Sequence, residues 1–483
     1  MKTNVALART ARVSQVPMLI GGRWVPGQTE YDVVDPYRGE VVARAPESTP
    51  ADLDRAIAAA VAAKGEAAAL KGYERAELLH KVGALLAGRA EEIAETMSRE
   101  TGKAIKDSRA EIARAKDTIR LSAEEAVRIQ GEHIPLDATA MGAGKIAMLL
   151  RFPVGVVAAI TPFNAPFNLA AHKLAPAVAA GNTVVLKPPP QAPSTVHRLV
   201  ELFVEAGLPA GHLNVVYGNQ VGPLLVRDPR IDFITFTGST RVGAEVKAAS
   251  GLRRVALELG GTGQTIVHAD ADIDEAATVC ARNAMRLAGQ SCASVQNIYV
   301  HESRYDELTA KLTAEIKKLR TGDPLDPETD VGTLIDENAA KRVESWIAEA
   351  VSGGARVAVG GGRRGAQLEP TLLLDVDPSM QVVCSETFGP LASVQSYSVL
   401  DDVFATVTDA PLGLQCGIYT KSIDTALSAA RRLRTGAVII NGTSTWRTDQ
   451  LPYGGVKNSG IGREGPHYAI REMTEERLIV FNF

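Results

Sequence analysis

The chain has 483 residues, of which 45% are hydrophobic and 22% charged, a composition typical of a globular protein and not of a disordered or fibrous one. The formal net charge of −4, without a basic stripe, argues against a nucleic-acid partner. The length predicts about two to four domains.

The cysteine pattern and the apolar runs indicate where in the cell the protein is expected and which partners it is expected to lack. Four widely spaced cysteines without a CxxC pair fit neither a disulfide scaffold nor a zinc site. We therefore expect free thiols, no metal and a reducing, cytoplasmic location. The most apolar run, VGVVAAITPFNAPF, is broken by prolines and too short to cross a bilayer, so no membrane partner is expected.

Helical periodicity dominates the first part of the chain. From residue 51 to about residue 130, apolar residues recur at three and four positions, which predicts a helical N-terminal layer. Helical segments then alternate with short apolar runs, where strands are expected: VGVVAAIT, TVVLKP, LNVVYG, DFITFTGS and RVALELGG. This alternation predicts parallel βαβ units, whose ligands bind beyond the carboxyl ends of the strands.

A second alternating block begins near Thr265. It runs from a strand into a helix that delivers Cys292, and further strands are expected at NIYV, LASVQSYSV, CGIYT and AVII. The turn-rich segment from Thr443 to Gly465 is predicted to be loop, and the final residues RLIVFNF are predicted to be a strand. The fold class is therefore α/β, with two α/β domains.

Residues able to carry chemistry stand at the ends of these strands or in the loops after them: Asn164, Lys187, the glycines of GSTRVG from Gly238 to Gly243, Glu258 and Cys292. Taken singly, each fits a structural role. An asparagine between prolines suits a turn, a charged residue suits a strand end, and GSTRVG is not a strict G-x-G-x-x-G. A lone cysteine is usually buried, although the small and polar neighbours of Cys292 leave room for a ligand.

Taken together, TPFNAP, VVLKP, FTGST, LELGG, GQSC, SETFGP and PYGGVKNSG resemble, in order over nearly the whole chain, the motifs of the aldehyde dehydrogenase superfamily. The tail is most similar to the branch of lactaldehyde, phosphonoacetaldehyde and non-phosphorylating glyceraldehyde-3-phosphate dehydrogenases. The resemblance implies a Rossmann-type cofactor domain (1–127 and 151–258), an α/β catalytic domain (259–448) and a small β oligomerisation arm (128–150 and 466–483).

The resemblance also implies an activity, the NAD(P)-dependent oxidation of an aldehyde to a carboxylic acid. Cys292 matches the nucleophile that forms a thiohemiacetal and then a thioester. The Asn164 amide and the Cys292 backbone N–H match the donors that hold the oxyanion. Glu258 matches the base that activates the hydrolytic water, and Lys173 matches a lysine of the proton relay.

Cofactor contacts follow from the same motifs. Many NAD-preferring relatives carry a glutamate three residues after the lysine matched by Lys187, and this glutamate repels a 2′-phosphate. Here that position is Pro190, and no arginine nearby selects NADP, so use of either NAD or NADP is expected. The matched positions are Thr161, Pro162, Phe163, Lys187, Gly238, Ser239, Leu259, Glu386 and Phe388.

Two arginines are candidates for substrate binding. Arg447 falls in the loop matched to the substrate entrance, and Arg120 lies on the predicted helix DTIRLSAEEA. A guanidinium suits a carboxylate, sulfonate or phosphonate group. Against this, Ser291 stands where some phosphonate and phosphate users carry an arginine. A small anionic aldehyde and a neutral or aromatic aldehyde are therefore both kept as substrate classes.

Two other functions are weighed against this one. A CoA-acylating reductase of the same fold is disfavoured by Glu258, because CoA-dependent members resolve the thioester without a water-activating base. A non-catalytic binding protein of this fold is disfavoured by the presence of Cys292, Asn164 and Glu258 together.

A homodimer or homotetramer is expected through the arm, because the backbone N–H and C=O groups of an unpaired edge strand can pair with a strand of another chain.

Overall fold

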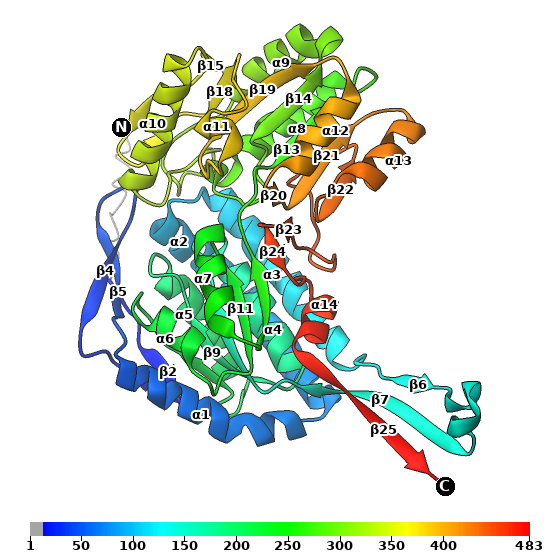
Figure 1. Ribbon diagram of the computed structural model, residues 1–483. Helices are drawn as coiled ribbons and strands as arrows, with labels where there is room; N and C mark the ends of the chain where they lie inside the picture. The colour runs from blue at the N-terminus through cyan, green and yellow to red at the C-terminus, as the bar shows by residue number, and fades with distance from the viewer. Residues whose placement is uncertain (1–12) are drawn as a thin grey trace.

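The computed structural model describes residues 13–483, which form two α/β sheets, a set of long helices and a projecting β arm (Figure 1). The predicted N-terminal helices are confirmed as α1 (Pro50–Ala69), α2 (Gly72–Thr101) and α3 (Ile105–Ala126), but they do not form one layer: α1 packs on the sheet strands β9 and β10, whereas α2 and α3 pack on α4 and α5. α1 begins at a capping box, in which Thr49 and Asp52 each accept from the backbone N–H of the other. No helix within residues 13–483 is long and apolar enough to cross a membrane.

The first sheet has eight strands in the order β24-β12-β11-β8-β9-β10-β2-β3. Its central strands, β12 to β10 in this order, are parallel and are the strands expected from the sequence. Helices between them complete the predicted βαβ units. The strands are β2 (Met18–Ile20), β3 (Arg23–Val25), β8 (Val156–Ile160), β9 (Thr183–Lys187), β10 (Leu213–Val215), β11 (Phe233–Thr237), β12 (Arg254–Glu258) and β24 (Gly460–Ile461), and the helices are α4 (Pro166–Ala179), α5 (Pro193–Glu205), α6 (Val221–Arg227) and α7 (Thr240–Ser250).

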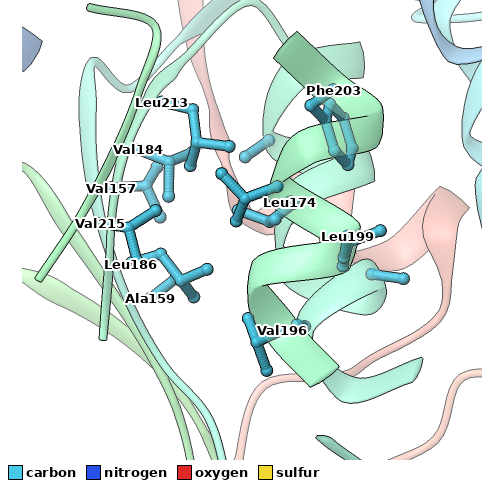
Figure 2. Close-up of a cluster of buried hydrophobic side chains, with 14 of the residues drawn as sticks. Val157, Ala159, Leu174, Val184, Leu186, Val196, Leu199, Phe203, Leu213 and Val215 are labelled. Atoms are coloured by element: carbon cyan, nitrogen blue, oxygen red, sulfur yellow. The ribbon is translucent and has the colours of Figure 1, made fainter. Parts of the chain in front are cut away.

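Figure 2 shows how this sheet packs against its helices. Each labelled side chain is at most 3% exposed, and the burial of one large aliphatic side chain contributes about 1.5–3 kcal/mol. This packing fixes the carboxyl ends of β8 and β9, after which the predicted site residues follow. The labelled residues are Val157, Ala159, Val184, Leu186, Leu213 and Val215 from β8, β9 and β10, and Leu174, Val196, Leu199 and Phe203 from α4 and α5.

The second sheet, in the upper part of Figure 1, has the order β15-β18-β19-β14-β13-β21-β22. Every neighbouring pair is parallel except β15 with β18. The second predicted α/β block is thereby confirmed. The strands are β13 (Gln264–Val267), β14 (Asn297–His301), β15 (Arg356–Val359), β18 (Thr371–Leu374), β19 (Leu391–Tyr397), β21 (Gln415–Tyr419) and β22 (Ala437–Ile440), and the helices are α8 (Ile273–Met285), α9 (Tyr305–Lys317), α10 (Glu337–Ser352), α11 (Gln381–Cys384), α12 (Leu400–Asp409) and α13 (Ile423–Arg432).

The segment from Thr443 to Gly465 departs from the predicted loop in two places. β23 (Val456–Lys457) pairs with β20 (Leu412–Gly413), and β24 pairs with β12 so that Gly460 lies opposite Glu258. The loop prediction was wrong here because strands of two residues are too short to show an alternating apolar pattern. The tail is therefore tied to the strand that carries Glu258, and α14 (Pro466–Glu472) follows it.

The arm consists of three antiparallel strands that project from the body in Figure 1. β25 (Thr474–Asn482), the strand expected at the C-terminus, pairs along its length with β7 (Lys145–Pro153), which also pairs with β6 (Glu132–Ile134). β25 is an edge strand, and its side chains Leu478, Val480 and Phe481 are exposed. The remaining elements are short: β1 (Ser14–Gln15), β4 (Glu30–Val34), β5 (Val41–Pro46), β16 (Arg363–Arg364), β17 (Gln367–Leu368), and the 3-10 helices η1 (Leu136–Ala138), η2 (Ala140–Gly142), η3 (Arg286–Gly289) and η4 (Glu302–Arg304).

Candidate active site

Cys292 lies in a tight turn between α8 and β14. The chain enters this turn through η3, in which Leu287 and Ala288 have φ angles of 57° and 50°, in the left-handed region. Gly289 has a φ of 69°, and a Cβ at this position would collide with the carbonyl oxygen of Gly389. Backbone in such a sparsely populated conformation costs about 1–3 kcal/mol per residue and is concentrated at functional sites.

The Cys292 thiol is half-buried, and its sulfur lies 3.1 Å from the hydroxyl oxygen of Tyr453. Burial raises the pKa of this thiol to about 12, although the bond to Tyr453 and the charge of Arg447 act in the opposite direction. The thiol is therefore protonated in the free protein at neutral pH. Attack by sulfur on an electrophile requires that this proton be removed.

Asn164 borders the same cavity as Cys292, between the end of β8 and the start of α4. The first turn of α4 is fixed by Glu111 of α3, whose carboxylate accepts from the backbone N–H groups of Phe167 at 2.9 Å and Asn168 at 3.0 Å. Lys103 pairs with this buried carboxylate. The predicted oxyanion donors, Asn164 and Cys292, therefore face one cavity whose walls are held in place.

Glu258 ends β12 and lines the cavity that contains Cys292. It is 6% exposed, and neither oxygen of its carboxyl group has a hydrogen-bond partner among residues 13–483. Burial, followed by the charge of Glu464, raises the pKa of Glu258 well above its usual range, while Lys173 acts against this rise. A carboxyl group whose pKa is moved upward towards neutrality is suited to general base catalysis.

Lys173 of α4 shares a small cavity with Glu258 and Glu464. Its ammonium donates to the hydroxyl of Thr235 at 3.0 Å and lies 3.7 Å from Glu464 Oε1, and burial lowers the pKa of Lys173. Burial would raise the pKa of Glu464, but neighbouring cations, Lys173 and Arg447 among them, hold it below its ordinary value. The sequence pattern did not single out Glu464, because only the folding of the tail back onto β12 brings it to the site.

A cavity of about 500 Å³ extends along the carboxyl ends of β8, β9 and β11. The hydroxyl groups of Thr161 and Thr237 line it and are buried without a partner among the described residues. Ser239 caps α7, so the N-terminal N–H groups of a helix also lie at this cavity. These features fit the ribose and phosphate groups of a dinucleotide. Six of the predicted cofactor residues line the cavity: Thr161, Pro162, Phe163, Lys187, Gly238 and Ser239.

A second cavity, of about 330 Å³, shares its Pro162 to Phe163 wall with the first one and reaches Cys292. Glu386 accepts from the backbone N–H of Gly261 at 3.3 Å, and burial raises the pKa of Glu386 to about 7. Phe388 packs edge-on against Phe163, with ring centroids 5.9 Å apart. The structure thus brings all predicted cofactor residues to one cleft that ends at the thiol, since Leu259, Glu386 and Phe388 line this second cavity.

Two arginines at the cleft correct a sequence-based expectation. No arginine was expected near the adenosine end, but Arg227 at the end of α6 and Arg241 in the first turn of α7 line the same cavity as Lys187 and Pro190. Arg241 pairs with Glu245 at 2.8 Å, whereas Arg227 is exposed at the rim. These arginines come from later βαβ units, so proximity in the sequence to Lys187 does not reveal them.

A smaller cavity of about 90 Å³, which we call the thiol pocket, also reaches Cys292. Arg447 lies there, with its Cζ atom 3.7 Å from the centroid of the Tyr453 ring. The Nε–H of Arg447 is buried without an acceptor among the described residues. The structure therefore places Arg447 beside the thiol. The pocket is lined by Arg114, Asn164, Ala165, Asn168, Leu169, Asn283, Arg286, Leu287, Ser291, Cys292, Ala293, Thr445, Arg447 and Tyr453.

The structure does not bring Arg120 to the thiol pocket. Its half-exposed guanidinium pairs with Asp117 at 3.2 Å and with Glu124 at 2.6 Å on the surface of α3. Arg114, on the same helix, lines the pocket instead, because six residues of an α-helix turn a side chain to a different face. We therefore replace Arg120 by Arg114 as the second candidate arginine.

The described residues hold no group of three or more His, Cys, Asp or Glu side chains placed to bind a metal ion. All four cysteines are free, and Cys292 is the one that lies at the cleft. The side chains that line the cleft and the small cavity behind it offer thiol, carboxyl, amide, ammonium and guanidinium groups.

Comparisons with known proteins agree with this geometry, and residues 24–479 match the aldehyde dehydrogenase family. The 3-sulfolactaldehyde dehydrogenase of Priestia aryabhattai is 44% identical over 473 residues, which cover 98% of this chain and 99% of that protein. The crystal structure of aldehyde dehydrogenase 21 from Physcomitrella patens, in complex with the reaction product succinate, has a TM-score of 0.95 and 39% identity, and the match covers 98% of this chain and 99% of that one. The crystal structure of NADP-dependent glyceraldehyde-3-phosphate dehydrogenase from Bacillus halodurans, complexed with NADP, has a TM-score of 0.95 and 35% identity, with 97% and 99% covered. The chain therefore belongs to the aldehyde dehydrogenase family and is an NAD(P)-dependent enzyme that oxidises aldehydes to carboxylic acids.

Proposed function

We propose that Cys292 is the nucleophile of this oxidation. Once the thiol proton has passed to solvent, the sulfur bonds to the carbonyl carbon and the π electrons of the C=O bond move to oxygen. The Asn164 amide and the Cys292 backbone N–H stabilise this oxyanion. When the electron pair of the aldehyde C–H bond leaves as hydride, the C=O bond re-forms and a thioester to Cys292 remains. The shared cavity of Cys292 and Asn164 supports these roles.

Glu258 is the general base for hydrolysis of this thioester. It takes a proton from water as the water oxygen attacks the carbonyl carbon, and the C–S bond then breaks to release the Cys292 thiolate. The proton passes on towards Lys173 and Glu464, which share a buried cavity with Glu258. The presence of this base favours hydrolysis over transfer of the acyl group to CoA.

The cleft would hold a dinucleotide, which when bound would supply the acceptor for the hydride. Lys187 would bind the adenosine ribose, and the start of α7 at Gly238 and Ser239 would bind the pyrophosphate. Glu386 and Phe388, which line the second cavity together with Cys292, would hold the nicotinamide end. Both NAD and NADP are accepted, because the segment after Lys187 carries prolines where a carboxylate would repel a 2′-phosphate.

Arg227→Glu is expected to weaken NADPH binding about tenfold and to change NADH binding by less than about twofold. The reason is that Arg227 lines the same cavity as Lys187, so that its charge attracts the 2′-phosphate that NADH lacks. Titration of the enzyme followed by the fluorescence of the bound reduced dinucleotide measures both dissociation constants. Equal weakening of the two dinucleotides would show that Arg227 has no part in their discrimination.

The aldehyde carries an acidic group. This conclusion rests on one observation, the unpaired Nε–H of Arg447. Its buried Nε–H has no acceptor among the described residues, and a buried donor without a partner costs about 1–3 kcal/mol. A carboxylate, sulfonate or phosphonate oxygen supplies that acceptor together with a compensating charge. The relatives described above act on or release compounds that contain acidic groups: sulfolactaldehyde, succinate and glyceraldehyde-3-phosphate.

A neutral aldehyde is the second candidate substrate, because exposed arginines near an entrance need not bind a ligand. The Arg447 side chain, however, is only 12% exposed and packs on the Tyr453 ring, which argues for a dedicated role. The thiol pocket, at about 90 Å³, favours an aldehyde of a few carbon atoms over an aromatic one.

The near-ultraviolet absorbance of reduced nicotinamide tests this function. The purified enzyme is assayed with NAD and with NADP against sulfoacetaldehyde, succinic semialdehyde, phosphonoacetaldehyde, propanal and benzaldehyde. We expect kcat/KM for the best acidic aldehyde to exceed that for propanal by at least about 30-fold, which corresponds to about 2 kcal/mol of differential binding. Equal or better turnover of propanal would contradict an acidic substrate.

We also propose the domain division expected from the sequence, with two adjustments at the arm. β7 continues to Pro153, and α14 packs against α4 of the body, so the arm comprises β6, β7 and β25. The exposed apolar side chains of the β25 edge support pairing with a second copy in a homodimer or homotetramer, and light scattering in solution tests this mass. Four free thiols support a reducing, cytoplasmic location.

A further inference from the structure

Asp449 lies against Arg114 and Arg447, two of the three arginines of the thiol pocket, and is 5% exposed. It accepts from Arg114 through two bonds, Nη2 to Oδ1 at 2.6 Å and Nε to Oδ2 at 3.2 Å. Its Oδ1 also lies 3.9 Å from Nη2 of Arg447 and 2.9 Å from Nε2 of His172. Burial would raise the pKa of Asp449, but His172 and Arg114 outweigh burial and hold it well below its usual range. Asp449 is therefore a permanent negative charge beside the pocket.

Two of the three arginines that line the thiol pocket each have a carboxylate partner. Arg286 is paired with Asp107 at 3.0 Å, and Arg114 is paired with Asp449. Arg447 is the third arginine of the pocket wall, and neither of these two ion pairs involves it.

The other carboxylate near Arg447 is shared between two cations. Glu464 lies 3.5 Å from Nη2 of Arg447, but it also lies 3.7 Å from the ammonium of Lys173. The three arginines that line the thiol pocket therefore outnumber by one the carboxylates paired with them, Asp449 and Asp107, and the Nε–H of Arg447 is an unsatisfied donor.

We propose that the thiol pocket selects aldehydes whose acidic group carries one negative charge, a carboxylate or sulfonate, over aldehydes with a doubly charged phosphonate or phosphate, and that Asp449 sets this preference. This inference rests on the proposed function, in which the aldehyde is acidic. A single negative charge is matched by this excess of one arginine, whereas a second one has no further cation to pair with and is repelled by Asp449, which does not line the pocket but lies against Arg114 and Arg447. Asp449 thus acts as a positioning and charge-setting residue through Arg114 and Arg447.

Sulfoacetaldehyde and phosphonoacetaldehyde form a matched pair of probes. Both are two-carbon aldehydes with a tetrahedral acidic group, and at pH 8 the sulfonate carries one charge while the phosphonate is predominantly doubly charged. We expect the wild-type ratio of kcat/KM, sulfonate over phosphonate, to be at least about 10. Asp449→Asn keeps the size of the side chain and removes its charge, and we expect it to lower this ratio by at least about fivefold.

The ratio is insensitive to partial unfolding, because both aldehydes are measured on one preparation of enzyme. Asp402→Asn, which removes the same charge from an exposed position on α12, should leave the ratio unchanged. If Asp449→Asn does not fold, Arg114→Gln replaces it and should move the ratio the other way, since it removes a positive charge from the pocket.

A wild-type ratio near one, or a ratio that neither variant changes, would overturn the charge preference. Failure of the proposed function has a different signature, because the wild-type enzyme would then oxidise propanal as well as it oxidises either acidic aldehyde. The neutral aldehyde is therefore included in every assay.

Discussion

Glu258→Gln is expected to lower steady-state turnover by about 100- to 10,000-fold while leaving the first hydride transfer intact. The amide keeps the shape of the side chain but cannot accept a proton from water, so the thioester accumulates on Cys292. Rapid mixing with dinucleotide and aldehyde should therefore give a burst of about one reduced nicotinamide per active site, followed by almost no further absorbance change. Stopped-flow absorbance at the nicotinamide band measures both phases.

The pH dependence of the same step has a definite sign. The base must be ionised to act, and burial raises the pKa of Glu258 well above its usual range. The kcat of the wild-type enzyme should therefore fall with decreasing pH well before the range in which an exposed glutamate is protonated. Glu258→Gln should lose this acid limb.

The matched control is Cys292→Ala, which should show neither burst nor turnover because it lacks the nucleophile. Turnover near the wild-type rate in Glu258→Gln would contradict the role of Glu258. A complete absence of the burst in that variant would show that Glu258 acts before the thioester forms.

Arg447→Gln is expected to lower kcat/KM for the best acidic aldehyde by about 30- to 1000-fold, or about 2–4 kcal/mol, and that for propanal by less than about threefold. The substitution removes the buried charged donor of the thiol pocket and keeps a polar side chain over the Tyr453 ring. Propanal has no acidic group, so it does not make this contact and should be little affected by the substitution. Steady-state assays with both aldehydes give the two values.

Arg120→Gln is the matched control, because Arg120 lies on α3 but pairs with Asp117 and Glu124 away from the pocket. Its ratio of acidic to neutral turnover should equal that of the wild-type enzyme. If Arg447→Gln lowers the turnover of both aldehydes equally, Arg447 supports the structure of the site and does not recognise the substrate.

The large-scale fold was predictable because it depends on local periodicity. Helical spacing over residues 51 to about 130 and the alternation of apolar runs with amphipathic segments indicated the N-terminal helices and both α/β units, and the structure confirms them. The family resemblance of the motifs was likewise confirmed, since residues 24–479 match the family. Each of these features is expressed over many residues that are close in the sequence.

The details of the site were less predictable because they depend on long-range contacts. The short strand β24 brings Glu464 into the same buried cavity as Glu258, although no local pattern marks this pairing. Periodicity placed Arg120 on the correct helix but could not show which face of α3 meets the pocket. Arg227 reaches the cofactor cleft from α6, a helix that follows Lys187 by a whole βαβ unit.

The covalent state of Glu258→Gln tests the proposed chemistry most directly. The variant is mixed with NADP and sulfoacetaldehyde, quenched with acid, digested and mapped by mass spectrometry. We expect a sulfoacetyl group on Cys292, no acyl group on Cys280, Cys384 or Cys416, and much less acylation when propanal is used at the same concentration. An unmodified Cys292 would contradict the thioester on Cys292. Equal acylation by propanal would contradict the recognition of the acidic group.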